Sequence, residues 1–231
     1  MRKLLVCVLA ALFVIGTSGL SYAKDYKLEK RMDEAAQVLD EIMQMPEQSI
    51  PKDLLDKAAA ILIFPSAISG GFIFGGKLGS GVGVYRDKDT GKWSAPCFFN
   101  MGGGSFGLQI GGAATDLVLV ITSKRGVEGL LKDNVTLGGD AAATAGPVGR
   151  NAKIETDLLL KAGILSYSRS KGLFAGISLQ GAVLGPNKEF NKSLYGRDIT
   201  AEEIFLTQKV AAPQSAQKLL NTVVKYAGGT K

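Results

Sequence analysis

The sequence predicts an α+β fold: a single domain with a glycine-rich, mostly antiparallel, curled sheet flanked by N- and C-terminal helices. Three observations carry this prediction. Residues 24–45 repeat apolar side chains at three- and four-residue spacing, residues 61–184 contain short alternating or β-branched runs broken by glycine turns, and residues 186–226 become helical again. Since no linker or compositional break divides residues 24–231, we interpret them as one domain.

The segment before this domain, residues 1–23, has the layout of a secretory signal peptide. Residues 2–3 are basic, residues 4–15 are apolar and uncharged, and residues 21–23 read Ser-Tyr-Ala, a small-x-small cleavage site. The apolar run is too short for a comfortable membrane span, and an uncleaved anchor is the alternative. We therefore expect an exported chain that begins at Lys24 after cleavage. It would be periplasmic or secreted, with peripheral attachment to a membrane as a further option.

Composition narrows the functional classes. Cleavage leaves 25 basic against 21 acidic residues. This mild, dispersed positive charge is compatible with anionic membrane surfaces, but it lacks the clustered basic patch that is typical of nucleic-acid binding. The chain has no histidine and, after cleavage, a single cysteine, so the usual zinc, haem, copper and disulfide chemistry is excluded. The acids Asp87 and Asp89 lack the remaining ligands of a calcium loop. We therefore expect no metal and no cofactor, and a packed core thiol at Cys97.

The N-terminal helix is predicted over residues 24–45 and is amphipathic. Its apolar stripe consists of Leu28, Met32, Ala35, Leu39 and Ile42 or Met43. Pro46 ends this helix, and Pro51 at a first helical position opens a short second helix that extends to about Ala60. A short apolar strand, Ile61–Phe64, then follows and is closed by Pro65.

A glycine-studded stretch, residues 70–112, holds 14 of the 30 glycines and is predicted to form closely packed strands. Val82 and Val84 alternate with glycines, and residues 87–91 form a polar hairpin turn. The side chains expected to share one face of the following strand are Trp93, Ala95, Cys97 and Phe99. Glycine weakens a strand unless neighbouring backbone approaches closely. Sharp curvature or a close second layer is therefore expected at Gly71, Gly75, Gly79 and Gly83.

The second half of the chain is predicted to continue the sheet and then to end in a helix. The expected elements are a buried strand over Leu117–Thr122, a short helix over Lys124–Lys132, an irregular segment over residues 138–150, two strands over residues 162–170 and 173–184, and a helix over Pro213–Tyr226. The final residues, Gly-Gly-Thr-Lys, are expected to form a loose tail.

Three enzyme-like patterns occur within the glycine-rich stretch, and none has the context it needs. Residues 71–77 fit a phosphate loop, but leucine replaces the magnesium-binding Ser or Thr and more strand follows. Residues 102–107 fit a dinucleotide fingerprint without the helix that must follow it. Ser105 lies in a nucleophile-elbow pattern, but the chain has no histidine base, which leaves a Ser-Lys arrangement with Lys77 or Lys124 as the formal alternative. We therefore predict a protein that is not an enzyme, with no catalytic residues and no nucleotide ligand.

An ordered set of unusual segments runs through the chain from about Leu28 to Val224. The segments are Ala59–Pro65 (AAILIFP), Gly71–Gly76 (GFIFGG), Trp93–Pro96 (WSAP), Gly104–Gly111 (GSFGLQIG), Asp116–Leu119 (DLVL), Leu137–Asp140 (LGGD), Ala145–Arg150 (AGPVGR) and Tyr167–Gly176 (YSRSKGLFAG). In this order they resemble the SYLF domain family, and the resemblance implies a lipid-binding domain. Eukaryotic members bind phosphatidylinositol-phosphate membranes, partly through an N-terminal amphipathic helix, and some bind and bundle actin.

The family's eukaryotic members often carry Src-homology-3 or FYVE modules, whereas this sequence carries the export leader typical of bacterial members. Export from a bacterium puts actin out of reach and argues against phosphoinositides as the natural ligand. The property that the resemblance carries over best is binding of another anionic or apolar lipid.

The residues predicted to contact lipid fall into two groups. The first lies on the N-terminal helix beside its apolar stripe, as in an interfacial helix, and consists of Lys24, Lys27, Lys30 and Arg31. The alternative for this helix is that the stripe packs on the domain, and interleaved acids weaken its electrostatic attraction to a membrane. The second group lies in two of the matching segments and consists of Arg150, Arg169 and Lys171. The alternative for these arginines is a structural pair with an acid such as Asp140 or Asp116.

We therefore predict an exported, non-enzymatic domain that binds lipid or a membrane surface. Its expected partner is an anionic or apolar lipid, with no nucleic acid and no nucleotide. The alternative is a scaffold or assembly protein of the cell envelope that acts through contacts with an unknown protein partner.

Overall fold

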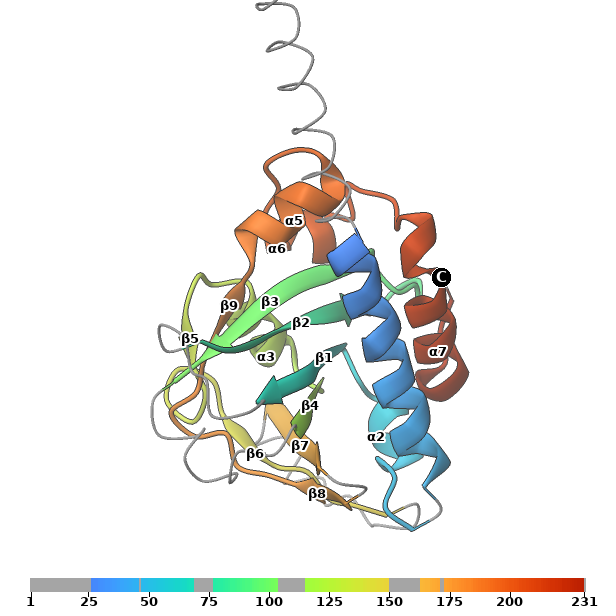
Figure 1. The fold of residues 1–231 in the computed structure, drawn as a ribbon, viewed down its shortest axis with the longest axis vertical. Helices are drawn as coiled ribbons and strands as arrows, with labels where there is room; N and C mark the ends of the chain where they lie inside the picture. The colour runs from blue at the N-terminus through green and yellow to red at the C-terminus, as the bar shows by residue number, and fades with distance from the viewer. Residues whose placement is uncertain are drawn as a thin grey trace, which may run out of the picture.

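The computed structural model describes residues 26–45, 47–68, 77–103, 115–149, 163–170 and 173–230. A curled, mostly antiparallel sheet carries helices from both ends of the chain, which confirms the predicted α+β fold (Figure 1). The helices are an N-terminal helix over residues 26–44, α2 (Lys52–Asp56), α3 (Lys124–Leu130), α5 (Lys188–Tyr195), α6 (Ala201–Phe205), the 3-10 helix η2 (Gln214–Ala216) and α7 (Gln217–Ala227). The strands are β1 (Ala60–Ile68), β2 (Lys77–Tyr85), β3 (Cys97–Gly102), β4 (Thr115–Ile121), β5 (Val135–Thr136), β6 (Ala143–Ala145), β7 (Ile164–Ser170), β8 (Leu173–Gly176) and β9 (Val183–Pro186).

The strands form a sheet in the order β5-β9-β3-β2-β1-β4-β7-β6, with β8 paired to β7 as well. Neighbouring strands are antiparallel except β6 and β7. β1 lies at the centre, where Ile61 is opposite both Val84 of β2 and Val120 of β4. β1 is hydrogen-bonded along both edges, and the layers on its two faces bury residues 60–65, which therefore read as an apolar run, whereas Ser66 is exposed.

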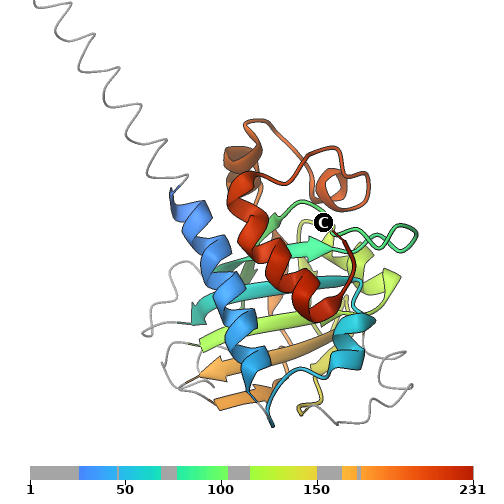
Figure 2. The same cartoon turned by 90° about the vertical axis from the view of Figure 1, so that its right-hand side faces the viewer.

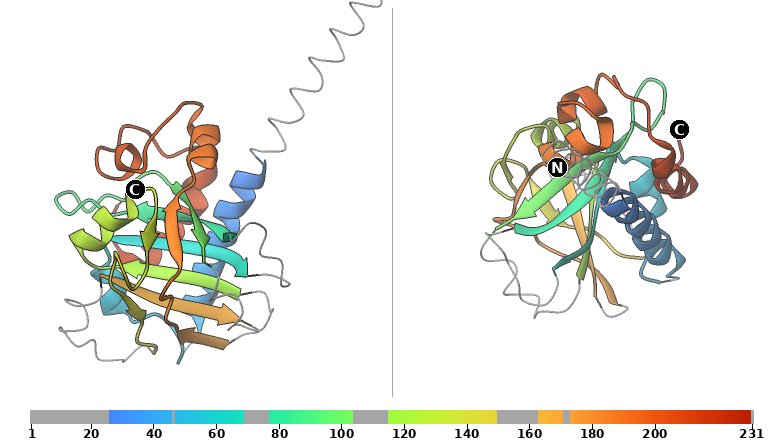
Figure 3. Two further views of the ribbon diagram at one scale, coloured as in Figure 1. Left: turned by 90° about the vertical axis from the view of Figure 1, so that its left-hand side faces the viewer. Right: turned by 45° about the horizontal axis from the view of Figure 1, so that its top comes forward.

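Each face of the sheet is covered by a separate layer. Ile61 and Ile63 point to the face that packs against the N-terminal helix, α2 and α7, and these helices lie across the strands in Figure 2. Leu62 and Phe64 point to the other face, which packs against α3 and α6, as Figure 3 shows from the opposite side. The molecule is therefore a three-layer arrangement with the sheet in the middle.

Side-chain caps mark where the C-terminal helices begin. The Asn187 side chain accepts a hydrogen bond of 2.9 Å from the Phe190 N–H and caps α5. Thr200 and Glu203 form a reciprocal capping box at the start of α6. Gly196 ends α5 with a φ of 68°, a left-handed conformation that glycine adopts without strain.

Glycines in β2 permit the close approach that the sequence predicts. A Cβ on Gly79 would lie 2.8 Å from the Ala67 Cα, and a Cβ on Gly83 would lie 2.8 Å from the Leu62 side chain. The expectation of close packing is therefore confirmed at these two positions. The expectation for Gly71 and Gly75 concerns residues outside the described part, as do the patterns within residues 69–76 and 104–114.

Two details of the predicted strands are wrong. Pro65 does not close the first strand, because β1 continues to Ile68 through a register shift where the proline needs no ladder partner. Trp93 does not share a face with Cys97, because it packs with the N-terminal helix and α7 while Cys97 faces the other layer. The reason lies at Ser94, whose Oγ accepts the Tyr85 N–H in place of a backbone carbonyl and interrupts the alternation.

The second half of the chain also departs from its prediction. Residues 173–184 form two strands rather than one, with β8 paired to β7 and β9 paired to β3. The segment over residues 138–150 contains β6 as well as irregular backbone. The tail is not loose over residues 228–230. Thr230 accepts the Trp93 N–H at 2.8 Å and donates to the Gly91 carbonyl at 3.0 Å, so the tail lies against the β2–β3 hairpin.

Candidate binding site

The N-terminal helix buries the stripe that was a candidate membrane face. Its stripe residues are at most 1% exposed and pack on the sheet: Leu28, Met32, Ala35, Leu39 and Ile42. The sheet face beneath them is itself apolar and requires cover. The stripe therefore packs on the domain, and any membrane contact by this helix must use its outer, polar side.

The predicted basic residues of this helix have different surroundings. Lys27 is exposed, with its Nζ 5.4 Å from the centroid of the Phe190 ring, and Lys30 is exposed with its Nζ 4.0 Å from a Glu34 oxygen. Arg31 donates a 2.7 Å hydrogen bond to the Pro65 carbonyl and so ties the helix to β1. Lys24 lies outside the described residues. Of the predicted basic residues of this helix that the structure describes, Lys27 and Lys30 have exposed side chains that can meet an outside surface.

The first described turn of the helix adds an aromatic residue to these cations. Tyr26 is 63% exposed and adjoins Lys27 in sequence. Lys30 follows one helical turn after Tyr26 and Lys27. Glu29 is also exposed and offsets part of the positive charge. Amphipathic aromatic rings and lysines are enriched where proteins meet the membrane–water interface. We name Tyr26, Lys27 and Lys30 the helix-start patch.

Arg169 forms an internal ion-pair cluster. Its Nε and Nη2 donate to the same Asp116 oxygen at 2.9 and 2.7 Å, and its Nη1 donates to Glu41 of the N-terminal helix. The two side chains of the Asp116 pair are only 18% and 15% exposed. The hydrogen bond from Arg169, together with one from Gln37, holds the pKa of Glu41 below its ordinary value.

This cluster bears directly on the second predicted group. Arg169 takes the structural role that was its alternative, with Asp116 as the partner rather than Asp140, which instead accepts the Thr136 N–H. A guanidinium that already binds two carboxylates has little capacity left for a lipid headgroup. Arg150 and Lys171 lie outside the described residues, so their predicted roles stay predictions.

Hydrogen bonds between the N-terminal helix and α7, which we call the clasp, join the two ends of the domain. The Lys225 Nζ and the Tyr226 hydroxyl both donate to the Asp40 Oδ1, at 2.8 and 2.6 Å. These two hydrogen bonds hold the pKa of Asp40 below its ordinary value. The N-terminal helix and α7 are therefore fixed side by side over the sheet, as in Figure 2.

The described residues show no catalytic arrangement. Cys97 is fully buried, burial raises the pKa of its thiol, and the Asn191 amide donates to its sulfur. Lys124, one partner in the formal Ser-Lys alternative, is 3.6 Å from Glu128 on the surface of α3. Ser105 lies outside the described part of the chain. No group of acids and cysteines within the described ranges is arranged to hold a metal ion.

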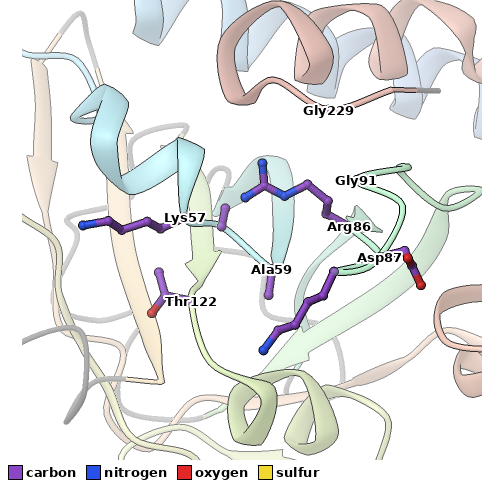
Figure 4. A pocket seen from close by; sticks show the side chains of 9 residues that line it. Lys57, Ala59, Arg86, Asp87, Gly91, Thr122 and Gly229 are labelled. Atoms are coloured by element: carbon purple, nitrogen blue, oxygen red, sulfur yellow. The ribbon is translucent and has the colours of Figure 1, made fainter.

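Sequence reasoning missed one cluster of cations. Lys57 follows α2, Arg86 and Lys88 belong to the β2–β3 hairpin, and all three line a pocket with a volume of about 550 Å³ at one end of the sheet (Figure 4). Thr122, directly after β4, and Gly229 in the C-terminal tail complete the wall. Each cation resembles an ordinary surface residue in the sequence, so only the fold brings them together.

The comparisons with known proteins agree on one family. A family model described as Ysc84, a Las17-binding protein and actin regulator, matches residues 102–226. An SH3 domain-containing protein of Schizosaccharomyces pombe is 41% identical over 176 residues, which cover 75% of this chain and 40% of the relative. The human SH3 domain-containing YSC84-like protein 1 is 36% identical over 203 residues, covering 84% of this chain and 59% of the relative. LAS seventeen-binding protein 3 of Saccharomyces cerevisiae is 35% identical over 184 residues, covering 78% of this chain and 39% of the relative.

The matched relatives are longer than this chain. It spans about two fifths of the two yeast proteins and under three fifths of the human one. Within the described residues, no helix combines the length and the apolar character that a membrane crossing needs.

Proposed function

Because the chain belongs to the Ysc84 family, whose domain is the SYLF domain, we propose that it is a non-enzymatic binding domain that attaches to anionic lipid surfaces after export. The observation that carries the proposal is the helix-start patch of Tyr26, Lys27 and Lys30. These side chains face outward from a helix whose remaining length is fixed to the sheet. A rigid helix presents such a patch without the entropic cost of ordering a flexible segment.

The expected attachment is weak and electrostatic. A lysine close to an anionic membrane contributes about 1 kcal/mol, and this attraction decays within a Debye length. Glu29 opposes it, and the buried stripe adds no apolar insertion. The domain should therefore bind anionic vesicles at low salt and leave them as the ionic strength rises.

A second candidate is a scaffold or assembly role through protein contacts. Two observations favour it: the family model is described by a protein partner, and Leu173 on β8 is 70% exposed. Since export from a bacterium separates the chain from actin, the partner would be an envelope protein. A domain that ignores every vesicle and crosslinks to an envelope protein through β8 would favour this candidate over lipid binding.

Export is tested first. The full chain is produced in a bacterial host, and the N-terminus of the purified protein is sequenced. We expect processing before Lys24 and recovery from the periplasm or the medium. An intact N-terminus on protein recovered from the cytoplasm would contradict export.

Lipid binding is then tested by co-sedimentation of this purified protein with vesicles. Phosphatidylglycerol vesicles should bind the protein at low salt, and pure phosphatidylcholine vesicles should leave it in solution. A Lys27→Glu/Lys30→Glu variant should lose most of the binding. A control variant, Lys132→Glu/Arg197→Glu, changes the net charge equally at exposed positions elsewhere and should retain more of it. If the two variants bind equally, the contact does not use the helix-start patch.

A further inference from the structure

The pocket in Figure 4 lies where four segments meet. Its walls come from residues 57–59 between α2 and β1, the β2–β3 hairpin, Thr122 directly after β4, and the C-terminal tail. Its volume of about 550 Å³ is within the range of small-molecule sites. The side chains of Lys57, Arg86 and Lys88 bring three cations to this one space.

Arg86 is held in place without a carboxylate partner. Its Nη1 donates a 2.9 Å hydrogen bond to the Ala227 carbonyl, its Nη2 donates to the Asp56 carbonyl, and its guanidinium carbon lies 5.3 Å from the centroid of the Trp93 ring. Guanidinium has five N–H donors, so these contacts leave donors available. Among the described residues, no carboxylate forms an ion pair with Arg86. Its charge is therefore fixed in position, and the Asp56 carboxylate, which acts on it electrostatically, is itself paired with Lys52 at 2.7 Å.

The acid at the pocket is turned away from it. Asp87 Oδ1 accepts hydrogen bonds from the Thr90 N–H and the Thr90 hydroxyl, both at 2.8 Å, and from the Asp89 N–H at 3.1 Å. Those bonds keep the carboxylate inside its own turn and hold its pKa below the ordinary value. Figure 4 shows the Asp87 carboxylate directed away from Arg86, whose guanidinium reaches toward the end of α2.

The two lysines keep their charge available. Lys57 and Lys88 are exposed, and neither is paired with a carboxylate in the part of the chain that the structure describes. Long lysine side chains can move to meet an incoming anion, whereas Arg86 supplies the fixed point.

We propose that Lys57, Arg86 and Lys88 form a binding site for a phosphate group, with Arg86 as the fixed donor and the lysines closing on the remaining oxygens. Three cations suit a phosphate monoester, whose charge approaches two negative units at neutral pH, better than a carboxylate with one. The pocket volume leaves room for the organic substituent of such an ester. This site is separate from the helix-start patch and does not depend on lipid attachment there.

The test is a titration of the full chain with inorganic phosphate, with the amide NMR spectrum recorded at each step. Phosphate replaces chloride, so that the ionic strength stays constant. We expect saturable shifts at Gly91 and Thr122, which line the pocket. Binding should strengthen as the pH rises through the second pKa of inorganic phosphate, near neutrality, because the ligand then becomes a dianion. Shifts that do not saturate, or that spread over the surface, would overturn the proposal.

Variants locate the site. Lys57→Gln/Lys88→Gln should raise the dissociation constant for phosphate at least about tenfold, because two charge-assisted contacts are lost. Lys132→Gln/Arg197→Gln removes the same charge elsewhere and should leave the constant almost unchanged. Both pairs are exposed, so both variants should keep the wild-type amide spectrum outside the substituted positions. Equal weakening by the two variants would overturn the assignment to the pocket.

Vesicles then separate a lipid headgroup from a soluble phosphate ester. Phosphatidic acid exposes a phosphate monoester, whereas phosphatidylglycerol carries a diester. If inorganic phosphate displaces the protein from phosphatidic acid vesicles, the pocket takes a lipid headgroup; if vesicles leave the pocket shifts unchanged, it takes a soluble ester. Either result supports the site. Failure of all vesicle binding with phosphate binding intact would contradict only the proposed lipid attachment.

Discussion

Replacing Arg169 with alanine is expected to destabilise the domain by about 3 kcal/mol at neutral pH. The substitution removes two hydrogen bonds to Asp116, at 2.9 and 2.7 Å, and one to Glu41. Removing one member of a buried ion pair typically costs about 3–5 kcal/mol, since the other charge is left without its partner. The Asp116 pair is 15–18% exposed and so belongs at the low end. The Glu41 side chain is 40% exposed, which limits its share to about 0.5 kcal/mol.

The pH dependence of this loss follows from Glu41. Arg169 and Gln37 hold its pKa in the folded protein below the ordinary value of 4.5. A depressed pKa contributes stability that is fully present above the unfolded value and is lost as the pH falls through the folded value. The alanine variant lacks the Arg169 part of this contribution, so its deficit should be largest near neutral pH and shrink below pH 4.5.

Urea denaturation followed by fluorescence measures both effects. The chain has a single tryptophan, Trp93, which is 2% exposed and should report unfolding. Arg197→Ala is the matched control, because Arg197 is exposed, and it should change the unfolding free energy by less than about 0.5 kcal/mol. A loss below about 1 kcal/mol for Arg169→Ala, or a deficit that stays constant down to about pH 3.5, would refute the reasoning.

Three further substitutions test other parts of the structure. Gly81→Ala places a Cβ 2.5 Å from the Phe64 ring and should lower the unfolding free energy by about 2 kcal/mol. An unchanged unfolding free energy would mean that β1 and β2 can move apart, and it would contradict the close packing. Trp93→Phe removes the 2.7 Å hydrogen bond from the indole N–H to the Gly228 carbonyl, and it should lower the unfolding free energy, measured by circular dichroism, by about 1 kcal/mol. Unchanged hydrogen exchange in the C-terminal tail would contradict the role of this bond in holding the tail. Ser49→Ala deletes a buried hydroxyl with no partner among the described residues, and we expect a gain of about 1 kcal/mol in urea rather than a loss.

The elements that could be predicted from the sequence are those that depend on residues close together in the chain. The N-terminal helix was predictable because its apolar side chains recur at helical spacing, and the hairpin turn at residues 87–91 because Asp and Gly are turn formers. The strand over residues 173–184 was not predictable as two pieces. β9 pairs with β3, which lies far away in the sequence, and no short-range pattern encodes that partner.

In the candidate sites, too, some contacts could be predicted from the sequence and others depend on the fold. Pairing of Arg169 with Asp116 was foreseen as an alternative, and the antiparallel register of β4 and β7 places the two residues directly opposite each other. The contribution of Glu41 depends on how the N-terminal helix crosses the sheet, which the sequence does not encode locally. The cationic pocket depends on four separated segments, and Lys57 alone carries no signal that distinguishes it from a solvated lysine.

The clasp between the N-terminal helix and α7 has a consequence for when the protein can fold. Asp40 and Lys225 are 185 residues apart, so the cover over one apolar face of the sheet is assembled from the first and last parts of the domain. During synthesis that face lacks the part of its cover that α7 supplies until the final helix has left the ribosome, and contacts of such long range form slowly. The complete cover of this face therefore cannot form before synthesis ends. That delay would help a protein that has to be threaded through a membrane before it folds.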